Sequence, residues 1–539
     1  MRIAVAQINA AVGDFSGNQK KILEFAWKAK NDGLSDLVLF PELCLCGCPP
    51  RGLLEQDRFI AENTNALRNL ADSLPEDLAV GVGYVKKSHS GKKNLNAYGI
   101  ILDHDIVFEQ FKKNPVRKDY FDESRYFESG RGSDVFEYPG ERLGIVFGDD
   151  IFGDEAIAQK LSGQNISFLC APSAFPFTAG EIKKRHEKAA RISRQWNIPF
   201  INVNAYGAND SVIFDGRSFV INSGLCTAAF AEDLIYADFP EIDSGKKNIS
   251  ESEPEDEIET ALVTGIRDYM KKCGFKKLHL GLSGGIDSAL VACLAVKAAG
   301  AENVVCINNP SEFSSKGSKD DSRELAANLG CEYIVLPINS IYDACVQTLG
   351  ETFRNKPFDI TEENLQSRIR GVLWMAYSNK FNSMLLSGGN KSELAMGYCT
   401  LYGDTNGALA PIGDLYKTEV IALCERINKR SIAASGKKII PQAILDKPPS
   451  AELRPGQKDE DSLPPYEVLD KILKLLIEEN LSAAEVISSG FEKELVEKIV
   501  RTIARSEWKR RQTPPVLRVS SGAFGPGMDM PLARSIYEV

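Results

Sequence analysis

The chain has 539 residues, 43% of them hydrophobic, which is enough for roughly two to four domains with buried cores. Its formal net charge of −10 argues against a general nucleic-acid binder and against a protein that binds anionic membranes. No run approaches the roughly 18 apolar residues that a membrane span needs, and the opening MRIAVAQINA predicts a strand rather than a signal peptide.

The cysteines and histidines give no sign of a metal centre. The twelve cysteines are scattered, and the four histidines show no metal-ligand spacing. Only Cys44, Cys46 and Cys48 form a cluster, and a metal site would need more ligands. We therefore expect packed, reduced thiols and a cytoplasmic protein.

Short apolar runs alternate with amphipathic stretches over residues 1–236, a rhythm typical of a layered α/β domain. The predicted strands include Ile3–Ala6, Leu37–Phe40, Ala79–Tyr84, Gly99–Leu102, Leu143–Phe147, Phe168–Ala171 and Phe200–Val203. A helix is predicted over Asn18–Lys30, between the first two strands.

Two segments of this half resemble the nitrilase superfamily. LVLFPELCLCGCPP, residues 37–50, resembles the glutamate motif of that superfamily, whose members form an αββα sandwich and hydrolyse amides with a glutamate, a lysine and a cysteine. The resemblance implies that Glu42 is the general base. FKKNPVRKDYFDESRYF, residues 111–127, is similar to the lysine segment of the glutaminase branch and implies Lys112 as the catalytic lysine, with Lys113 as the alternative.

The nucleophile position departs from the nitrilase pattern. After the strand that corresponds to Leu143–Phe147 the family has a Cys-Glu-Asp sequence, where this chain has Gly148, Asp149 and Asp150. Glycine has no side chain and cannot form the thioester that releases ammonia from glutamine. Cys170 and the thiols at 44–48 are poor substitutes because a displaced sulfur would not be aligned for attack.

Two more positions agree with loss of glutamine hydrolysis. Lys118 stands where the glutaminase branch has a tyrosine that helps hold glutamine. Glu181 stands where a lysine would pair with the substrate carboxylate, which a glutamate would repel. We therefore predict a degenerate amidase in which Glu42 and Lys112 remain as a structural ion pair.

A polar, acidic stretch separates the two halves. DSGKKNISESEPEDEIET, residues 243–260, is typical of a linker that leads into a helix near Glu257–Lys271. We expect a nitrilase-like domain at 1–242, a linker at 243–255 and a second domain at 256–539.

LHLGLSGGIDS, residues 278–288, has the pattern strand, glycine loop, helix. Such a loop directs backbone N–H groups and the positive end of a helix dipole at one point, where a phosphate binds. It lacks the lysine of G-x-x-x-x-G-K-[ST] and does not match G-x-G-x-x-G. SGGIDS resembles the pyrophosphate loop of the ATP pyrophosphatases, and Asp287 implies a bridging Mg²⁺ because a carboxylate would otherwise repel phosphate. The predicted ATP-binding residues of this loop are Gly281, Leu282, Ser283, Gly284, Gly285, Ile286, Asp287 and Ser288.

Further strands and helices alternate after this loop. Strands are predicted at Asn303–Asn308, Tyr333–Ile338 and Met384–Leu386, with a helix start at Ser318 and a helix over 361–381 capped by Thr361. In that helix Leu365, Ile369, Val372, Leu373 and Ala376 fall on one face. This spacing favours a Rossmann-like parallel sheet with the phosphate loop at its carboxyl edge.

Four long segments extend the resemblance. TEENLQSRIRGVLWMAYSNKF at 361–381, GNKSELAMGYCTLYGD at 389–404, DKPPSAELRPGQKDEDSLPPYEVLD at 446–470 and KRRQTPP at 509–515 resemble the synthetase domain of the NAD synthetases. With the nitrilase-like front, the chain resembles the glutamine-dependent two-domain form. That family adenylates the carboxylate of deamido-NAD⁺ with ATP and then displaces AMP with ammonia.

The resemblance also implies site residues. ATP contacts are implied for Gly388, Lys417 and Ser450, deamido-NAD⁺ contacts for Asn364, Glu393 and Lys509, and Mg²⁺ ligation for Asp287 and Glu393. Gly388 departs from the family, which usually has a threonine there, so a hydroxyl contact worth about 0.5–1.5 kcal/mol would be missing.

We therefore predict an α/β ligase that needs ATP and Mg²⁺, amidates deamido-NAD⁺ with ammonia and forms a homo-oligomer, with no nucleic-acid or membrane partner. Three alternatives remain open: an enzyme that still hydrolyses glutamine, an ATP pyrophosphatase that amidates another acceptor, as GMP synthetase or a tRNA-modifying amidase does, and a non-catalytic nucleotide-binding protein. The retained Asp287 and Glu393 disfavour the last.

Overall fold

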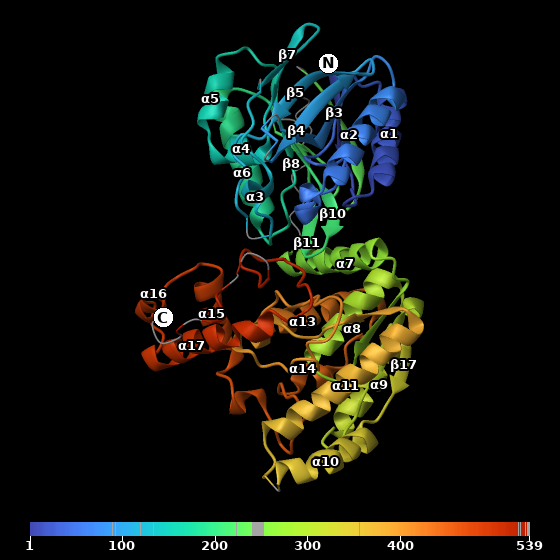
Figure 1. The fold of residues 1–539 in the computed structure, drawn as a ribbon, viewed down its shortest axis with the longest axis vertical. Coiled ribbons are helices and arrows are strands. Elements are labelled where there is room, and N and C mark those ends of the chain that lie inside the picture. Colours follow the sequence, from blue (N-terminus) through green and yellow to red (C-terminus); the bar gives the residue numbers. More distant parts are fainter. Residues whose placement is uncertain are drawn as a thin grey trace. The chain divides into compact units, whose positions relative to one another are not determined.

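The computed structural model divides into two compact units, Met1–Ser252 and Glu253–Val539. It describes the whole chain except residues 89, 92, 119, 133, 222–223, 240–252, 355, 526–527, 529, 534 and 536–539. Most of the predicted linker at 243–255 therefore lies outside the described residues. Each unit is a layered α/β structure, as predicted (Figure 1).

The first unit is an αββα sandwich. One six-stranded sheet has the order β14-β1-β2-β3-β4-β5, the other has the order β13-β12-β9-β8-β7-β6, and β10 pairs with β11 in a separate hairpin. The strands are β1 (Arg2–Gln7), β2 (Leu37–Leu39), β3 (Ala79–Lys87), β4 (Asn94–Leu102), β5 (Asp105–Phe111), β6 (Val135–Tyr138), β7 (Glu141–Ile145), β8 (Phe168–Ser173), β9 (Phe200–Asn204), β10 (Tyr206–Asn209), β11 (Val212–Asp215), β12 (Phe219–Val220), β13 (Leu225–Cys226) and β14 (Asp233–Asp238). The helices are α1 (Phe15–Asn31), α2 (Asp57–Ser73), α3 (Glu123–Tyr126), α4 (Gly148–Gly153), α5 (Ala156–Ser162) and α6 (Glu181–Trp196), with a 3-10 turn at Arg51–Glu55.

Alternating side chains hold the layers of this sandwich together. Ile3 and Val5 of β1 join the core between the two sheets, whereas Ala4 and Ala6 face α1 and α2. This follows because successive side chains of a strand point to opposite faces of its sheet. Apolar residues of α5 and α6 cover the outer face of the second sheet in the same way.

The second unit is built on a four-stranded sheet of order β17-β16-β15-β18, in which every pairing is parallel. Its strands are β15 (Lys277–Gly281), β16 (Val304–Asn308), β17 (Glu332–Val335) and β18 (Ser383–Leu386). Its helices are α7 (Pro254–Lys272), α8 (Ile286–Ala299), α9 (Lys316–Leu329), α10 (Asn339–Phe353), α11 (Ile360–Phe381), α12 (Lys391–Met396), α13 (Lys417–Ser435), α14 (Gln442–Asp446), α15 (Tyr466–Ile477), α16 (Ala483–Ser488) and α17 (Lys493–Arg510), with 3-10 turns at Ala301–Asn303 and Asp459–Asp461. Among the helices in the described part of the chain, none is long and apolar enough to cross a membrane.

Two predicted helix starts were wrong by a few residues. Ser315, not Ser318, caps α9, since its side chain accepts a hydrogen bond from the backbone N–H of Ser318. Asp359, not Thr361, caps α11, and its side chain accepts from the N–H of Thr361. In both cases a second residue that is able to cap stands a little earlier in the chain, and the sequence alone does not rank the two.

A buried ion cluster fixes α12 in the second unit. The Nζ atom of Lys391 lies 3.0 Å from the carboxylate of Asp414 and 2.8 Å from that of Glu478, and it donates a hydrogen bond to Ser520 Oγ at 2.8 Å. Asp414 also accepts from the backbone N–H groups of Val519 and of Ser520 itself. Because the ammonium is fully paired, the cluster avoids the cost of an isolated buried charge. It anchors the helix that carries Glu393.

Candidate active sites

A cavity of about 280 Å³ lies at the carboxyl ends of β15, β16 and β18 in the second unit. This is the edge of a parallel sheet at which ligands bind. Of the residues predicted from the sequence, the cavity is lined by Gly281, Leu282, Ser283, Gly285, Ile286, Asp287, Ser288, Gly388, Glu393, Lys417 and Ser450. The structure thus brings most of the predicted ATP-binding residues to one place.

The glycine loop has the shape that its residues predict. Gly284 has φ +84°, and a Cβ atom there would lie 2.4 Å from the backbone oxygen of Ser318, so the position requires glycine. Ser288 Oγ donates to the carbonyl of Gly285 at 2.9 Å, and the N–H of Gly285 donates to Ser283 Oγ at 3.2 Å. These bonds brace the turn from which α8 begins, with the N-terminal end of the helix at the cavity.

Two acidic residues from distant parts of the chain meet at Lys417. The buried ammonium of Lys417 contacts the carboxylate of Asp287 and lies 3.5 Å from that of Glu393. Asn390 Nδ2 donates to Asp287 at 3.0 Å and so orients it. Burial, and then the nearby charge of Asp287, raise the pKa of Glu393 to about 8. The arrangement places two carboxylates so close together that they favour a cation between them.

Asn364 and Lys509 lie behind the cavity wall. Asn364 Oδ1 accepts a hydrogen bond from Thr400 Oγ1 at 2.8 Å, and Lys509 Nζ donates to the carbonyls of Gly397 and Cys399 at 2.7 and 2.8 Å. Thr400 itself lines the cavity. Both residues therefore support the same segment, 397–400, and their contact with deamido-NAD⁺ stays a prediction.

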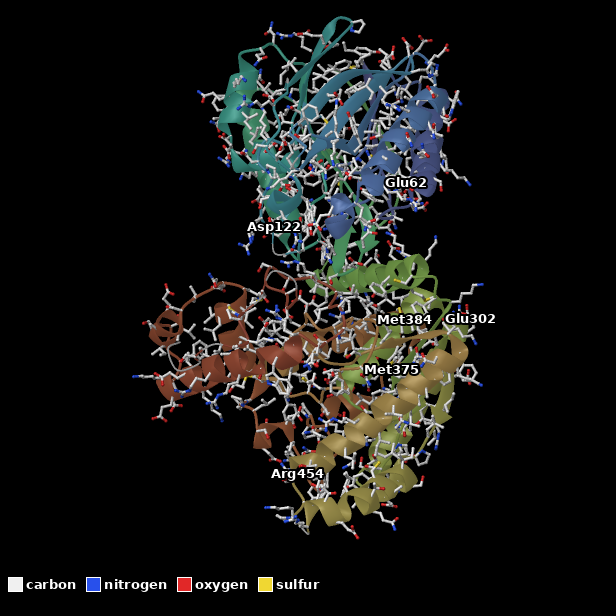
Figure 2. The ribbon with its side chains drawn as sticks, viewed as in Figure 1. Glu62, Asp122, Glu302, Met375, Met384 and Arg454 are labelled. Atoms are coloured by element: carbon white, nitrogen blue, oxygen red, sulfur yellow. The ribbon has the colours of Figure 1, made fainter. Side chains whose placement is uncertain are left out.

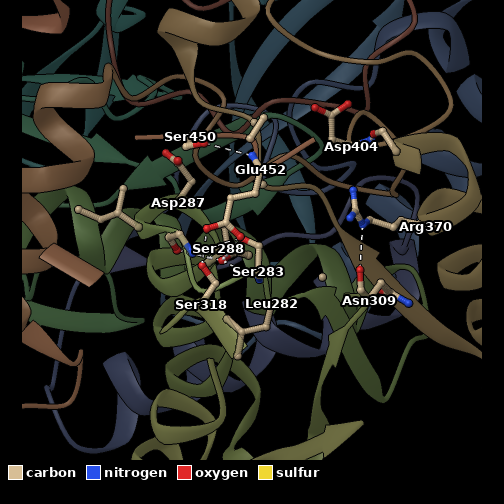
Figure 3. A pocket seen from close by; sticks show the side chains of 18 of the residues that line it. Leu282, Ser283, Asp287, Ser288, Asn309, Ser318, Arg370, Asp404, Ser450 and Glu452 are labelled. Carbon is tan, nitrogen blue, oxygen red and sulfur yellow. Dashed lines mark hydrogen bonds between the residues drawn. The ribbon is translucent and has the colours of Figure 1, made fainter. Parts of the chain in front are cut away.

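Several lining residues were missed from the sequence. Ser367, Arg370 and Trp374 project into the cavity from α11, and the helical spacing of these three was the signal that could have found them. Lys447 and Glu452 flank the predicted Ser450 and form an ion pair with each other, and Ser318 Oγ donates to Glu452 at 2.7 Å. Figure 3 shows Ser450 accepting a hydrogen bond from the backbone of Glu452, at 3.2 Å.

The amidase centre in the first unit is an ion cluster. Lys112 Nζ lies 2.9 Å from Glu42, 2.7 Å from Glu123 and 2.6 Å from Asp149, and all four side chains are largely buried. Burial by itself would lower the pKa of Lys112, but the charges of these three carboxylates raise it. Lys113 pairs instead with Asp134, so the structure selects Lys112 as the partner of Glu42.

The space around Gly148, the predicted nucleophile position, is filled. A Cβ atom on Gly148, the first residue of α4, would lie 2.1 Å from Ser173 Oγ and 2.7 Å from the ring of Phe175. Lys118 Nζ lies 5.5 Å from the centre of the Phe175 ring and 2.6 Å from the carboxylate of Asp149. Side chains of this chain therefore occupy the space around the position where a nucleophile would stand.

The cysteines considered as substitutes are buried in the first unit. Cys170 is fully buried in the core between the sheets, and burial followed by the charge of Glu42 raises the pKa of Cys48 well above its ordinary value. A protonated, buried thiol is a weak nucleophile. Glu181 pairs with Lys184 one turn along α6, so its effect on a bound substrate stays a prediction.

Comparison with known proteins decides the family. The NAD synthase family model matches residues 258–513, and the carbon-nitrogen hydrolase model matches residues 2–240. The glutamine-dependent NAD(+) synthetase of Synechocystis sp. is 43% identical, over 99% of both chains. The chain belongs to the glutamine-dependent NAD(+) synthetase family. This NAD synthetase is a ligase that forms a carbon–nitrogen bond, which confirms the predicted reaction class and fold.

Other relatives extend over the whole chain as well. The glutamine-dependent NAD(+) synthetase of Thermotoga maritima is 37% identical, over 100% of this chain and 99% of its own. The structure of glutamine-dependent NAD+ synthetase from Acinetobacter baumannii, in complex with ADP, superposes with a TM-score of 0.77 at 36% identity and covers 98% of each chain. The glutamine-dependent NAD(+) synthetase from Cytophaga hutchinsonii has a TM-score of 0.85 at 20% identity and supports the fold alone.

Proposed function

We propose that this NAD synthetase makes NAD⁺ from deamido-NAD⁺, ATP and ammonia in the cavity of the second unit, with the nitrilase-like part at 1–242 and the synthetase part at 256–539. The observation that carries the proposal is the convergence of the glycine loop, Lys417 and two carboxylates on one cavity. The solved Acinetobacter baumannii relative binds ADP, which supports ATP as the nucleotide here.

In this proposal a deamido-NAD⁺ carboxylate oxygen attacks the α-phosphorus of ATP, and the bond to the β-phosphate breaks so that pyrophosphate leaves with the electron pair. Ammonia then attacks the acyl carbon, AMP leaves, and the nitrogen loses a proton. The start of α8 lines the cavity, and the N-terminal end of a helix suits the leaving pyrophosphate. Lys417 stabilises negative charge that develops beside it.

Asp287 and Glu393 are the residues that would hold Mg²⁺. Their carboxylate oxygens are the ligands that this hard cation prefers, and they already share the ammonium of Lys417. The site therefore fits a cation. A bound Mg²⁺ would supply positive charge beside the phosphate oxygens. The ammonium of Lys417 would add a second positive charge close by.

For the nitrogen donor we propose ammonia that does not come from this chain's own amidase centre. The support is Gly148 at the nucleophile position, with Ser173 and Phe175 filling the space around it. The second candidate is an enzyme that still hydrolyses glutamine, and the names of the relatives favour that candidate.

A comparison of nitrogen donors tests the proposal. Purified protein is supplied with ATP, Mg²⁺, deamido-NAD⁺ and either ammonium or glutamine, and NAD⁺ is measured together with released glutamate. Ammonium should support synthesis while glutamine gives little NAD⁺ and no glutamate above the blank. Equal rates with both donors would establish the second candidate, and no NAD⁺ with either donor would refute the proposal.

We also propose a homo-oligomer, in the cytoplasm as the reduced thiols predict. The α10 helix has no buried residue among those described. Exposed apolar side chains include Val346 on α10 and Val372, Met375 and Phe381 on α11, of which Figure 2 labels Met375. Val372 is 67% exposed, so the apolar face predicted for α11 is not buried throughout in this chain. A self-association surface would cover these residues, and sedimentation at several protein concentrations would test it.

A further inference from the structure

The strongest unassigned feature of the cavity is the guanidinium of Arg370. Its Nε donates to the backbone carbonyl of Asn309 at 3.0 Å, a bond drawn in Figure 3. Within the described part of the chain, neither terminal nitrogen makes a hydrogen bond or an ion pair. Because the side chain lines the cavity, these two nitrogens are available to a ligand there.

A cation in such a place is costly unless an anion joins it. Burial lowers the pKa of Arg370 to about 10, so the side chain still carries its charge at neutral pH. Two other cations of the cavity, Lys417 and Lys447, are paired with carboxylates, whereas Lys319 lines the cavity as a further positive charge. The charges of Asp404 and Glu452 act on this guanidinium, but in the described part of the chain neither carboxylate forms an ion pair with it. Where it lines the cavity, it therefore favours an anionic partner from outside the chain.

The position of Arg370 lies between the regions assigned to the two substrates. One turn further along α11, Trp374 donates to Asn309 Oδ1 at 2.6 Å, and its ring packs against Gly281 at the start of the phosphate loop. One turn earlier, Ser367 accepts a hydrogen bond from the backbone N–H of Asp404 at 3.1 Å. The carboxylate of Asp404 in turn accepts from the backbone N–H of Thr400, whose side chain bonds Asn364, on the side predicted for deamido-NAD⁺.

We propose that Arg370 binds substrate at the junction of ATP and deamido-NAD⁺, where it holds an oxyanion: the carboxylate that becomes adenylated or the α-phosphate to which it is joined. This inference rests on the proposed function, since it assigns the two substrates to this cavity. A planar guanidinium held by Asn309 presents two parallel N–H groups, which match the two oxygens of a carboxylate or a phosphate. Arg370 therefore aligns the oxyanion for the transfer step as well as neutralising it.

The test compares Arg370→Gln and Arg370→Lys with the wild type, using ammonium as nitrogen donor. The glutamine variant should raise the KM for the substrate that Arg370 holds by about 10- to 100-fold, the cost of one or two charge-assisted hydrogen bonds. A raised KM for deamido-NAD⁺ identifies the carboxylate, and a raised KM for ATP identifies the α-phosphate. Lysine should recover only part of the loss because it offers a point charge without the fork.

Three further measurements keep the inference open to refutation. Arg323→Gln removes an exposed arginine of α9 and should leave all constants unchanged. Added guanidinium should restore part of the activity of Arg370→Ala, which a purely structural role would not allow, and this arm also serves if the glutamine variant folds poorly. If the wild type makes no NAD⁺, the proposed function fails, and calorimetric binding of ATP and deamido-NAD⁺ to wild type and variant still tests Arg370. Constants and affinities within about twofold of wild type for both substrates, with no rescue, would overturn the inference.

Discussion

Restoring a thiol at the amidase centre tests how far that centre has changed. The perturbation is Gly148→Cys in the full chain. If the surrounding pocket were otherwise intact, this substitution alone would give the protein glutamine hydrolysis. The structure predicts no such gain, because the space next to Gly148 is occupied.

The magnitude follows from the contacts of the new side chain. Its Cβ would lie 2.1 Å from Ser173 Oγ and 2.7 Å from the Phe175 ring, both closer than atoms can approach without movement. Overpacking of this kind costs about 1–3 kcal/mol. For a unit of this size the cost corresponds to a fall in Tm of roughly 2–12 °C. Adding Ser173→Ala removes the nearer contact and should return part of that loss.

The assay measures the Tm of each variant, and then its NAD⁺ and glutamate production with ammonium or glutamine as nitrogen donor. Gly148→Cys should melt earlier than wild type, retain NAD⁺ synthesis with ammonium and release no glutamate from glutamine. The matched control is Gly153→Cys at the other end of α4, where a Cβ meets no atom within 4 Å. That variant should melt like the wild type.

The opposite result would refute the reasoning. If Gly148→Cys alone gave glutamine-driven NAD⁺ synthesis at the ammonium rate with an unchanged Tm, the pocket would still be an amidase that lacks only its sulfur. The ion pair between Lys118 and Asp149 would then not prevent glutamine binding.

Three other changes test different parts of the chain. Gly388→Thr should lower the KM for ATP by about two- to tenfold, since a Cβ there meets no atom within 4 Å and a hydroxyl contact is worth about 0.5–1.5 kcal/mol; an unchanged or higher KM would argue against an ATP contact at this position. Asp149→Asn should destabilise the first unit by about 3–5 kcal/mol because it leaves Lys112 and Lys118 short of a buried partner. Burial would raise the pKa of Asp149, but those two lysines lower it below its ordinary value of 3.8. The stability that ionised Asp149 contributes is therefore present above about pH 4 and is lost as the pH falls through the pKa of the folded state. The difference in Tm between Asp149→Asn and wild type should accordingly be constant down to about pH 4 and shrink below it. Val372→Asp should shift the sedimentation of the protein toward the monomer, and an unaltered profile would remove α11 from the proposed self-association surface.

The sequence predicts the phosphate loop well because its chemistry is local. The turn at Gly284, the strand before it and the helix after it depend on neighbouring residues, so the short motif carries the information. The same holds for the sandwich of the first unit, where alternation along β1 assigns its residues to opposite faces.

Contacts between distant segments were harder to predict. Arg370 was overlooked because its place in the cavity depends on Asn309, which lies in the loop after β16 and far from it in sequence. The sequence also carried no sign that Lys509, predicted to touch substrate, donates a hydrogen bond to the carbonyl of Gly397, 112 residues away. The choice between Lys112 and Lys113 likewise needed the position of Glu42.

The ion cluster at Lys391 has a consequence for the order in which the protein is completed during synthesis. This lysine stands two positions before Glu393, yet its partner Ser520 is made 129 residues later. A nascent chain that has not reached the segment at 519–520 holds a buried ammonium and Asp414 without their full set of partners. The helix that carries Glu393 therefore gains its full set of contacts only late in translation, after the glycine loop has left the ribosome. A chain that stops short of this segment should fold with α12, and Glu393 on it, incompletely anchored.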